Sequence, residues 1–211
     1  MNLHLWFSFL AATVVLLLIP GPTVLQCIGD ALANSGRRNW STILGVGLGD
    51  AVAMSLSLVG AGALLKASAA AFTVMKTIGG LYLVYLGIRA IWAANRSDQS
   101  LHVTKSSTTS ESAMMRFGKA STITALNPKS ILFFVAFVPQ FITPQAGFAR
   151  QAAILLATFV ILAMVNAWVY MSLAGFLGLR LQTKTARKTV GYASGGVLLA
   201  AGSLTLALKQ R

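Results

Sequence analysis

The chain has 211 residues, of which 56% are hydrophobic and only 10% are charged, and its mean hydropathy is +0.74. Because a soluble domain usually carries about 25% charged residues, this composition excludes an ordinary soluble domain and indicates an integral membrane protein whose partner is the lipid bilayer. The net charge of +13 does not indicate a nucleic-acid partner, because the basic residues lie in short loops between apolar runs.

Six apolar segments are long enough to cross a bilayer, which takes about 20 residues of helix. We therefore expect an all-α integral membrane protein with about six transmembrane helices. The first segment lacks the basic flank of a secretory signal peptide, so we expect it to remain as a membrane helix. The segments are residues 5–32, 40–65, 69–93, 120–142, 151–177 and 189–208.

A polar, Ser/Thr-rich stretch at residues 94–119 separates two halves, 1–93 and 120–211, each with three of the expected spans. Such a composition is typical of a flexible loop, and we expect its last part, 113–119, to lead into the fourth span. Most Lys and Arg residues lie in this stretch and near the ends of the first and fifth spans. The positive-inside rule then places these regions in the cytoplasm of a bacterial cell, with both termini facing outward from its inner membrane.

Each half begins with a span that proline interrupts, at Pro20-Gly21-Pro22 in the first half and at Asn127-Pro128-Lys129 in the second. With three spans per half, the second half enters the membrane from the opposite face. The halves are therefore predicted to form two inverted three-helix repeats whose broken first helices lie near the midplane, as in many secondary transporters. Two ordinary proline kinks without symmetry are the alternative.

Several short motifs follow one another along nearly the whole chain. They are Ile19-Pro20-Gly21-Pro22-Thr23, Ser35-Gly36-Arg37-Arg38, Gly45-Val46-Gly47-Leu48-Gly49-Asp50, Gly80-Leu81-Tyr82-Leu83-Val84-Tyr85-Leu86-Gly87, Leu126-Asn127-Pro128-Lys129-Ser130-Ile131-Leu132-Phe133-Phe134 and Val138-Pro139-Gln140-Phe141. In this order they resemble the lysine exporter / homoserine-threonine resistance (LysE/RhtB) family of amino-acid exporters. The resemblance implies export of amino acids or close derivatives from the cytoplasm, driven by the proton gradient. Thr23 departs from the family pattern, which often has Asn there, and the loss of that amide is expected to alter substrate choice.

The first break is the sharpest local signal of a binding site. Proline removes a backbone donor and clashes with the preceding turn, and glycine adds backbone freedom, so Pro20, Gly21 and Pro22 should unwind the helix. Freed backbone groups at membrane depth must face protein or a water-filled cavity, where N–H groups suit a carboxylate and carbonyls suit an ammonium. We predict that these residues and Thr23 bind a zwitterionic substrate. The alternative is a hinge that never touches substrate.

The second break adds polar side chains to the predicted site. Asn127 can satisfy the backbone that Pro128 leaves unpaired, or it can bind the substrate. Lys129 can neutralise a substrate carboxylate or pair with Asp50, and the alternative is that it extends to the membrane interface. Gln140 is expected to line an exit path.

Asp50 is the only acidic residue deep within an expected span. An ionised carboxylate is costly in hydrocarbon, so Asp50 should face the interior of the bundle. There it can carry the coupling proton or contact a substrate ammonium, with a structural ion pair as the alternative. Asn166 is its expected counterpart in the second half, and Asp30 is expected to form a salt bridge near Arg37 and Arg38.

Glycines at G-x-x-x-G spacing predict close helix packing. Gly45 and Gly49 form one such pair, and Gly191 and Gly195 form another, which packs either within the bundle or between the protomers of a homodimer. Trp168, by contrast, is expected to be buried as a packing residue.

The chain lacks the sequence signals of an enzyme or a metalloprotein. It has one cysteine and two histidines, and no P-loop, H-E-x-x-H or G-x-S-x-G motif is present. We therefore expect no metal, no cofactor and no enzymatic activity.

These features predict a secondary active exporter of amino acids or small derivatives that is coupled to protons. Because only one deep carboxylate is available, a dibasic substrate would lack a second counter-charge. Neutral amino acids such as homoserine, threonine or leucine, or their lactones, are therefore favoured. The alternative is a passive channel or pore for small solutes, which so few polar membrane residues could form only in an oligomer.

Overall fold

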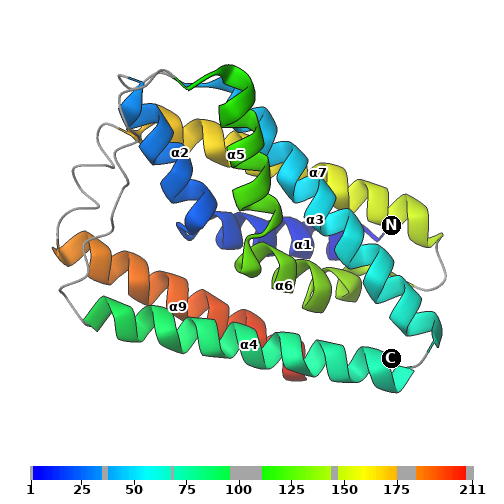
Figure 1. The fold of residues 1–211 in the computed structure, drawn as a ribbon. Helices are drawn as coiled ribbons and strands as arrows, with labels where there is room; N and C mark the ends of the chain where they lie inside the picture. The colour runs from blue at the N-terminus through cyan, green and yellow to red at the C-terminus, as the bar shows by residue number, and fades with distance from the viewer. Residues whose placement is uncertain are drawn as a thin grey trace.

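The computed structural model describes residues 2–34, 38–67, 69–95, 111–143, 147–174 and 184–207, and these residues form helices without β-strands (Figure 1). The helices are α1 (Leu3–Leu18), α2 (Pro22–Ala33), α3 (Trp40–Ala67), α4 (Ala69–Asn95), α5 (Ala113–Ala125), α6 (Pro128–Ala136), the 3-10 turn η1 (Val138–Phe141), α7 (Phe148–Ser172) and α9 (Lys184–Ala207). The expected lead-in at 113–119 is the first part of α5, which continues without interruption. Most of the polar stretch before it lies outside the described residues.

Helices suited to a membrane are present in both halves. Trp40–Gly60 of α3 and Phe148–Ser172 of α7 have mean hydropathies of 1.7 and 2.3, high enough for a span. Two bent pairs, α1 with α2 and α5 with Pro128–Phe141, pass the same test if each counts as one span, so the described part holds two to four candidate spans. The apolar parts of α4 and α9, Thr77–Trp92 and Leu198–Ala207, are shorter.

Both predicted proline breaks are present. At the first, Ile19 adopts an extended conformation, as expected for a residue before proline, and Pro22 occupies the first turn of α2, where it needs no donor. The axes of α1 and α2 differ by 54°. At the second, Pro128 begins α6 after an extended Asn127, and the bend is 48°.

The helices of the two halves are interleaved, so that each half packs on helices of the other. Helix α3 of the first half lies on α5 and α6, α7 of the second half lies on α1 and α2, and α4 runs along α9 (Figure 1). At the centre, the Phe133 ring of α6 contacts Phe9 of α1 at a centroid distance of 6.4 Å and Phe159 of α7 at 6.1 Å. This aromatic contact fixes α6, and with it the second break, next to α1.

Glycines set the closest helix approaches. A Cβ on Gly45 or Gly49 of α3 would lie 2.5 Å from the carbonyl oxygen of Phe117 or 2.6 Å from that of Ser121, both on α5. The predicted packing of this pair is therefore confirmed. Gly195 packs within the chain, because a Cβ on it would lie 2.6 Å from the backbone oxygen of Gly87 on α4 and 2.4 Å from the Ile91 side chain.

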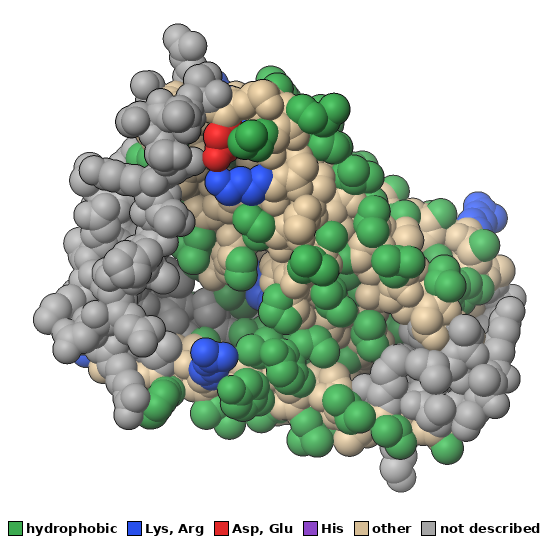
Figure 2. Space-filling model, in the orientation of Figure 1, with side chains coloured by type: hydrophobic (Ala, Val, Ile, Leu, Met, Phe, Trp, Pro, Cys, Tyr) green, Lys and Arg blue, Asp and Glu red, His purple; other side chains and the backbone are tan. Residues whose placement is uncertain are grey.

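Much of the outer surface is apolar, as a lipid-facing surface requires. Figure 2 shows hydrophobic side chains spread over the described part of the visible face, with few charged ones among them. Examples from three helices are Leu56, Ile78 and Ile161, which are all more than half exposed. Trp168 is also exposed, at 39%, so the expectation that it is buried was wrong.

Replacing Gly49 with alanine should destabilise the protein, because the added methyl group overlaps the backbone of α5. Such overpacking costs about 1–3 kcal/mol. Gly60→Ala is the matched control on the same helix, since a Cβ there meets nothing within 4 Å. Thermal unfolding of the purified variants in detergent should show a lower midpoint for Gly49→Ala alone, and equal midpoints would contradict the packing described here.

Candidate functional site

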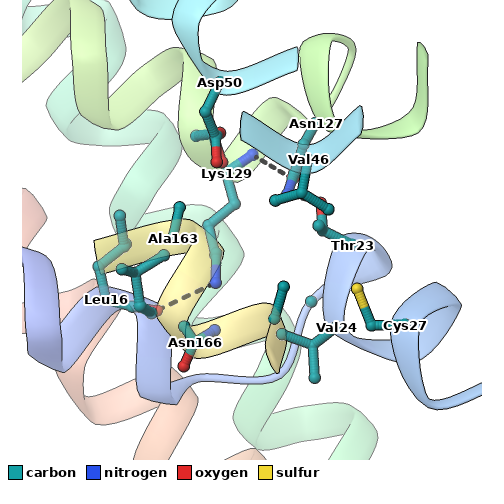
Figure 3. Close-up of a pocket in the computed structure, with 14 residues that line it drawn as sticks. Leu16, Thr23, Val24, Cys27, Val46, Asp50, Asn127, Lys129, Ala163 and Asn166 are labelled. Atoms are coloured by element: carbon teal, nitrogen blue, oxygen red, sulfur yellow. Dashed lines mark hydrogen bonds between the residues drawn. The ribbon is translucent and has the colours of Figure 1, made fainter. Parts of the chain in front are cut away.

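A pocket lies where the two proline breaks meet, between α3 and α7 (Figure 3). Its lining includes Gly21 from the first break, and its polar lining side chains are Thr23, Asp50, Asn127, Lys129, Ser130 and Asn166. The free volume inside it is about 30 Å³. Since one water molecule needs at least about 10–15 Å³, the space that remains would hold one or two waters and no amino acid.

The C-terminal carbonyls of α1 receive donors from the second half of the chain. The Lys129 ammonium donates to the carbonyl oxygens of Leu16 and Ile19, at 3.1 and 2.8 Å. The Tyr170 hydroxyl donates to that of Leu18, at 2.8 Å. The last carbonyls of a helix lack partners within it and carry partial negative charge. A cation with N–H donors therefore supplies the missing hydrogen bonds and also balances the charge.

The N-terminal turn of α2 faces the same pocket. No side chain caps this turn, whose N-cap residue is Gly21, and Thr23 and Val24 line the pocket. The first N–H groups of a helix have no partner within it and attract anions. The first break therefore presents carbonyls at one end and an uncapped helix N-terminus at the other, an arrangement that suits a zwitterion.

Thr23 and Asn127 join the two breaks. The Asn127 amide nitrogen donates to the Thr23 hydroxyl at 3.3 Å, and the Thr124 hydroxyl lies within hydrogen-bonding distance of the same oxygen. Asn127 is also the N-cap of α6, because its side-chain oxygen accepts from the Lys129 backbone N–H at 3.1 Å. The side chain is almost fully buried. Its amide nitrogen links the two breaks, and its oxygen caps the start of α6.

Asp50 and Lys129 both line the pocket, but they do not form the ion pair that was one of the two roles predicted for Lys129. The ion pairs within the described ranges are Arg116–Asp30 and Lys119–Glu111. Asp50 is only 3% exposed, and its Oδ1 finds no hydrogen-bond partner in that part of the chain. The Lys129 ammonium turns away from it and ends inside the pocket at the α1 carbonyls (Figure 3).

The remaining predicted residues have other positions. Pro20, Pro22 and Pro128 shape the chain at the breaks but are not among the residues that line the pocket. Gln140 lies in η1, away from the lining, and its amide donates to the carbonyl of Ala136 at 2.8 Å. Asn166, the expected counterpart of Asp50, does line the pocket.

Sequence reasoning missed two contributors to the site. Cys27 lines the pocket, and helical spacing could have revealed it, because it follows Thr23 by one turn. Tyr170 gives no sequence signal, since its role depends on where α7 passes the end of α1.

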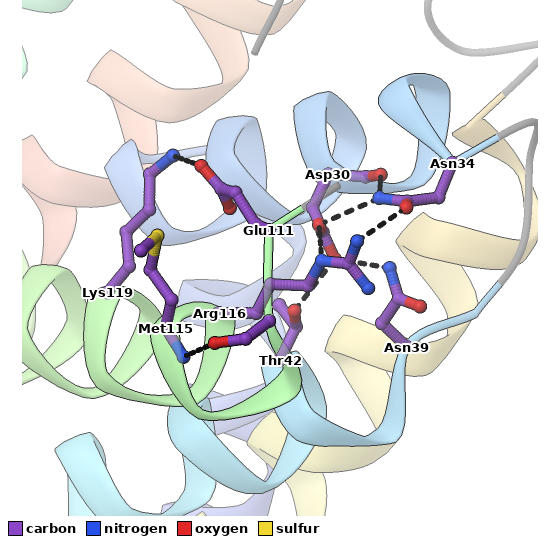
Figure 4. A network of polar contacts seen from close by, with 9 residues as sticks. Asp30, Asn34, Asn39, Thr42, Glu111, Met115, Arg116 and Lys119 are labelled. Carbon is purple, nitrogen blue, oxygen red and sulfur yellow. Dashed lines mark hydrogen bonds and ion pairs between the residues drawn. The ribbon is translucent and has the colours of Figure 1, made fainter. Parts of the chain in front are cut away.

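A second polar cluster ties α5 to α2 and to the start of α3 (Figure 4). Asp30 pairs with Arg116 of α5 at 3.4 Å. Of the two arginines expected near Asp30, Arg38 instead lies over the Trp168 ring at 5.1 Å, and Arg37 lies outside the described residues. The other members are Asn34, Asn39 and Thr42, which all donate to Asp30.

Comparison with known proteins agrees with this architecture. A family model described as LysE type translocator matches residues 14–210. The chain belongs to the LysE family. It is therefore a membrane protein of a transporter family and not an enzyme.

The relatives of this LysE-family chain include named efflux proteins. A protein of Vibrio cholerae serotype O1, described as an uncharacterized membrane protein, is 34% identical over 99% of this chain and 100% of its own length. The homoserine/homoserine lactone efflux protein of Salmonella typhimurium is 31% identical over 97% of each chain. The leucine efflux protein of Enterobacter sp. strain 638 is 29% identical over 83% of this chain and 80% of its own. No solved structure matches significantly.

Replacing Arg116 with methionine should destabilise this LysE-family protein. The change leaves the Asp30 carboxylate without its cation in a site that is only 11% exposed, and losing a hydrogen-bonded charge partner costs about 1–3 kcal/mol. Lys119→Met is the matched control on the same helix, because the Lys119–Glu111 pair is more exposed, at 45% for the lysine. Thermal unfolding in detergent should separate the two variants. Equal losses of stability would show that the cluster does not hold α5 to α2.

Proposed function

We propose that this protein is a secondary active exporter of amino acids or small derivatives, coupled to protons. The observation that carries the proposal is the pocket in which two broken helices present complementary polar groups beside a buried carboxylate without a hydrogen-bond partner among the described residues. Broken helices around a midplane site are a recurrent design of secondary transporters. The family membership, shown by the match over residues 14–210, supports transport as the activity.

The pocket offers partners for both charged ends of a zwitterion. Carbonyl and carboxylate oxygens suit an ammonium, whereas the N–H groups at the N-terminus of α2 suit a carboxylate. One lining carboxylate, Asp50, is present in the pocket, so a second positive charge on the substrate would have no counter-charge there. This balance favours a substrate with a neutral side chain.

The names of the relatives narrow the substrate class further. Homoserine, homoserine lactone and leucine, which appear in those names, all carry an α-ammonium, but the lactone has no free carboxylate. A site that accepts this set therefore recognises the ammonium first. We propose homoserine, threonine, their lactones and leucine as the substrates of this chain.

Alternating access requires the two halves to move relative to each other. Helix α3 rests on the broken pair α5–α6, and α7 rests in the equivalent way on the broken pair α1–α2. This reciprocal packing supports the inverted repeat of three spans in each half. The distribution of basic residues supports a bacterial inner membrane with both termini outward.

The main alternative is a passive pore for small solutes. A pore needs a continuous polar path, whereas the pocket has a free volume of about 30 Å³ and a lysine side chain within it. These features favour a carrier that must change shape. Electrical recording in a planar bilayer should show no single-channel currents, and discrete currents would support the pore.

Cells that overproduce the protein should resist toxic concentrations of some members of the proposed substrate class. The panel consists of homoserine, homoserine lactone, threonine and leucine, with lysine as the dibasic comparison. Growth is compared with that of cells carrying Asp50→Asn at equal protein level. Resistance to none of the compounds, or to lysine alone, would contradict the proposed activity.

Asp50→Asn should abolish proton-driven transport while leaving exchange of substrate for substrate. The amide cannot take up or release a proton, but it keeps the shape of the pocket. In proteoliposomes, accumulation against a gradient should fall by more than about tenfold, within the usual range of coupling energies. Asp98→Asn, the same change in the polar stretch after α4, is the control. If Asp50→Asn still accumulates substrate, then Asp50 does not carry the proton.

A further inference from the structure

The tip of Lys129 occupies a binding position built from the end of α1. Its ammonium donates to the carbonyl oxygens of Leu16 and Ile19, and a Cβ placed on Gly21 would lie 3.5 Å from the same nitrogen. The lysine comes from the second half of the chain and the carbonyls come from the first. The contact is therefore a cation-binding position that the chain fills with its own side chain.

The chemistry of this position is that of a primary ammonium. A lysine side chain ends in a compact cation with three donors, and the α-ammonium of an amino acid presents the same group. Carbonyls at a helix C-terminus attract such a cation through the helix dipole. Any small molecule with a primary ammonium is thus a chemical match for what Lys129 now contributes.

The pocket has no room for both cations at once. With Lys129 in place, its free volume is about 30 Å³, which is too small for an amino acid. A cargo ammonium can reach the carbonyls of Leu16 and Ile19 only if the lysine side chain leaves them.

The Asp50 carboxylate provides a second binding position for the ammonium of the displaced lysine. Asp50 lines the same pocket as Lys129, and in Figure 3 it is drawn toward the start of the Lys129 side chain, whereas the α1 carbonyls lie at the tip. Asp50 Oδ1 is buried and has no hydrogen-bond partner among the described residues. An ammonium that leaves the carbonyls therefore finds an unpaired acceptor within the same pocket.

We propose that the carbonyl oxygens of Leu16 and Ile19 form the subsite for the cargo ammonium, and that Lys129 fills this subsite as an internal competitor until cargo displaces it. This inference rests on the proposed exporter function and adds which group of the cargo is recognised and where. It also assigns Lys129 to the ammonium end of the cargo rather than to the carboxylate end.

Removing the competitor should strengthen the binding of a simple amine. The probes are isoamylamine, which is leucine without its carboxyl group, and isocaproate, which is leucine without its amino group. Binding of each to the purified full chain in nanodiscs is measured by calorimetry. If Lys129 occupies the subsite in about nine molecules of ten, Lys129→Met should bind isoamylamine about tenfold more tightly and bind isocaproate no better.

Two control variants separate this role from general damage. Tyr170→Phe removes the other donor to the end of α1, at Leu18, without emptying the subsite, so it should not tighten amine binding. Lys119→Met makes the same chemical change at an exposed lysine and should also have no effect. Unchanged, weaker or undetectable isoamylamine binding in Lys129→Met would overturn the proposal, and so would weaker isocaproate binding with no gain for the amine.

The unaltered chain gives a second readout if Lys129→Met does not fold. Cys27 is the only cysteine, and it is buried where it lines the same pocket. N-ethylmaleimide can therefore alkylate it only when the pocket opens, and the rate of alkylation reports on the occupant. Isoamylamine should change this rate and isocaproate should not, whereas equal effects of the two probes would contradict the subsite. Amino-acid export is measured separately in the resistance assay. If the probes fail while export is observed, the subsite is contradicted and the exporter function stands. If export is absent, the exporter function is contradicted, and the probe experiments still decide whether the subsite exists.

Discussion

The architecture depends on satisfying the backbone groups that proline releases inside an apolar bundle. A helix that ends at membrane depth exposes carbonyls that lipid cannot satisfy. At the end of α1, those of Leu16, Leu18 and Ile19 receive donors from Lys129 and Tyr170, which belong to the other half. The break in one half is thus stable only because the other half lies against it, which explains why the pocket and the interface between the halves coincide.

The same constraint separates what could be predicted from what could not. Proline acts on its own stretch of chain, so Pro20-Gly21-Pro22 and Asn127-Pro128-Lys129 were enough to predict both bends. The burial of Asp50 followed from the cost of a carboxylate in hydrocarbon. The direction of the Lys129 side chain did not follow, because it depends on which of two acceptors tertiary packing brings within reach. Asp30 illustrates the same limit, since its partner Arg116 lies on a helix that is remote in sequence.

Thr23 shows how one residue can serve both structure and specificity. Its hydroxyl lies within hydrogen-bonding distance of Asn127 and Thr124, and it also lines the pocket. An amide at this position would add donors and bulk at the point where the two breaks touch. Thr23 therefore sets the polarity of the pocket wall and at the same time keeps the link between the halves.

The contact between α4 and α9 has a mechanical consequence. Gly87 and Gly195 bring the backbones of the two helices close together, and the side chains of Ile91 and Leu199 pack against these glycines at the crossing. Packed side chains resist a change in crossing angle because they must change rotamer or lose contacts. Ile91 and Leu199 supply that resistance here, so rotating α4 against α9 would cost packing contacts. The pair is thus suited to move as one rigid unit.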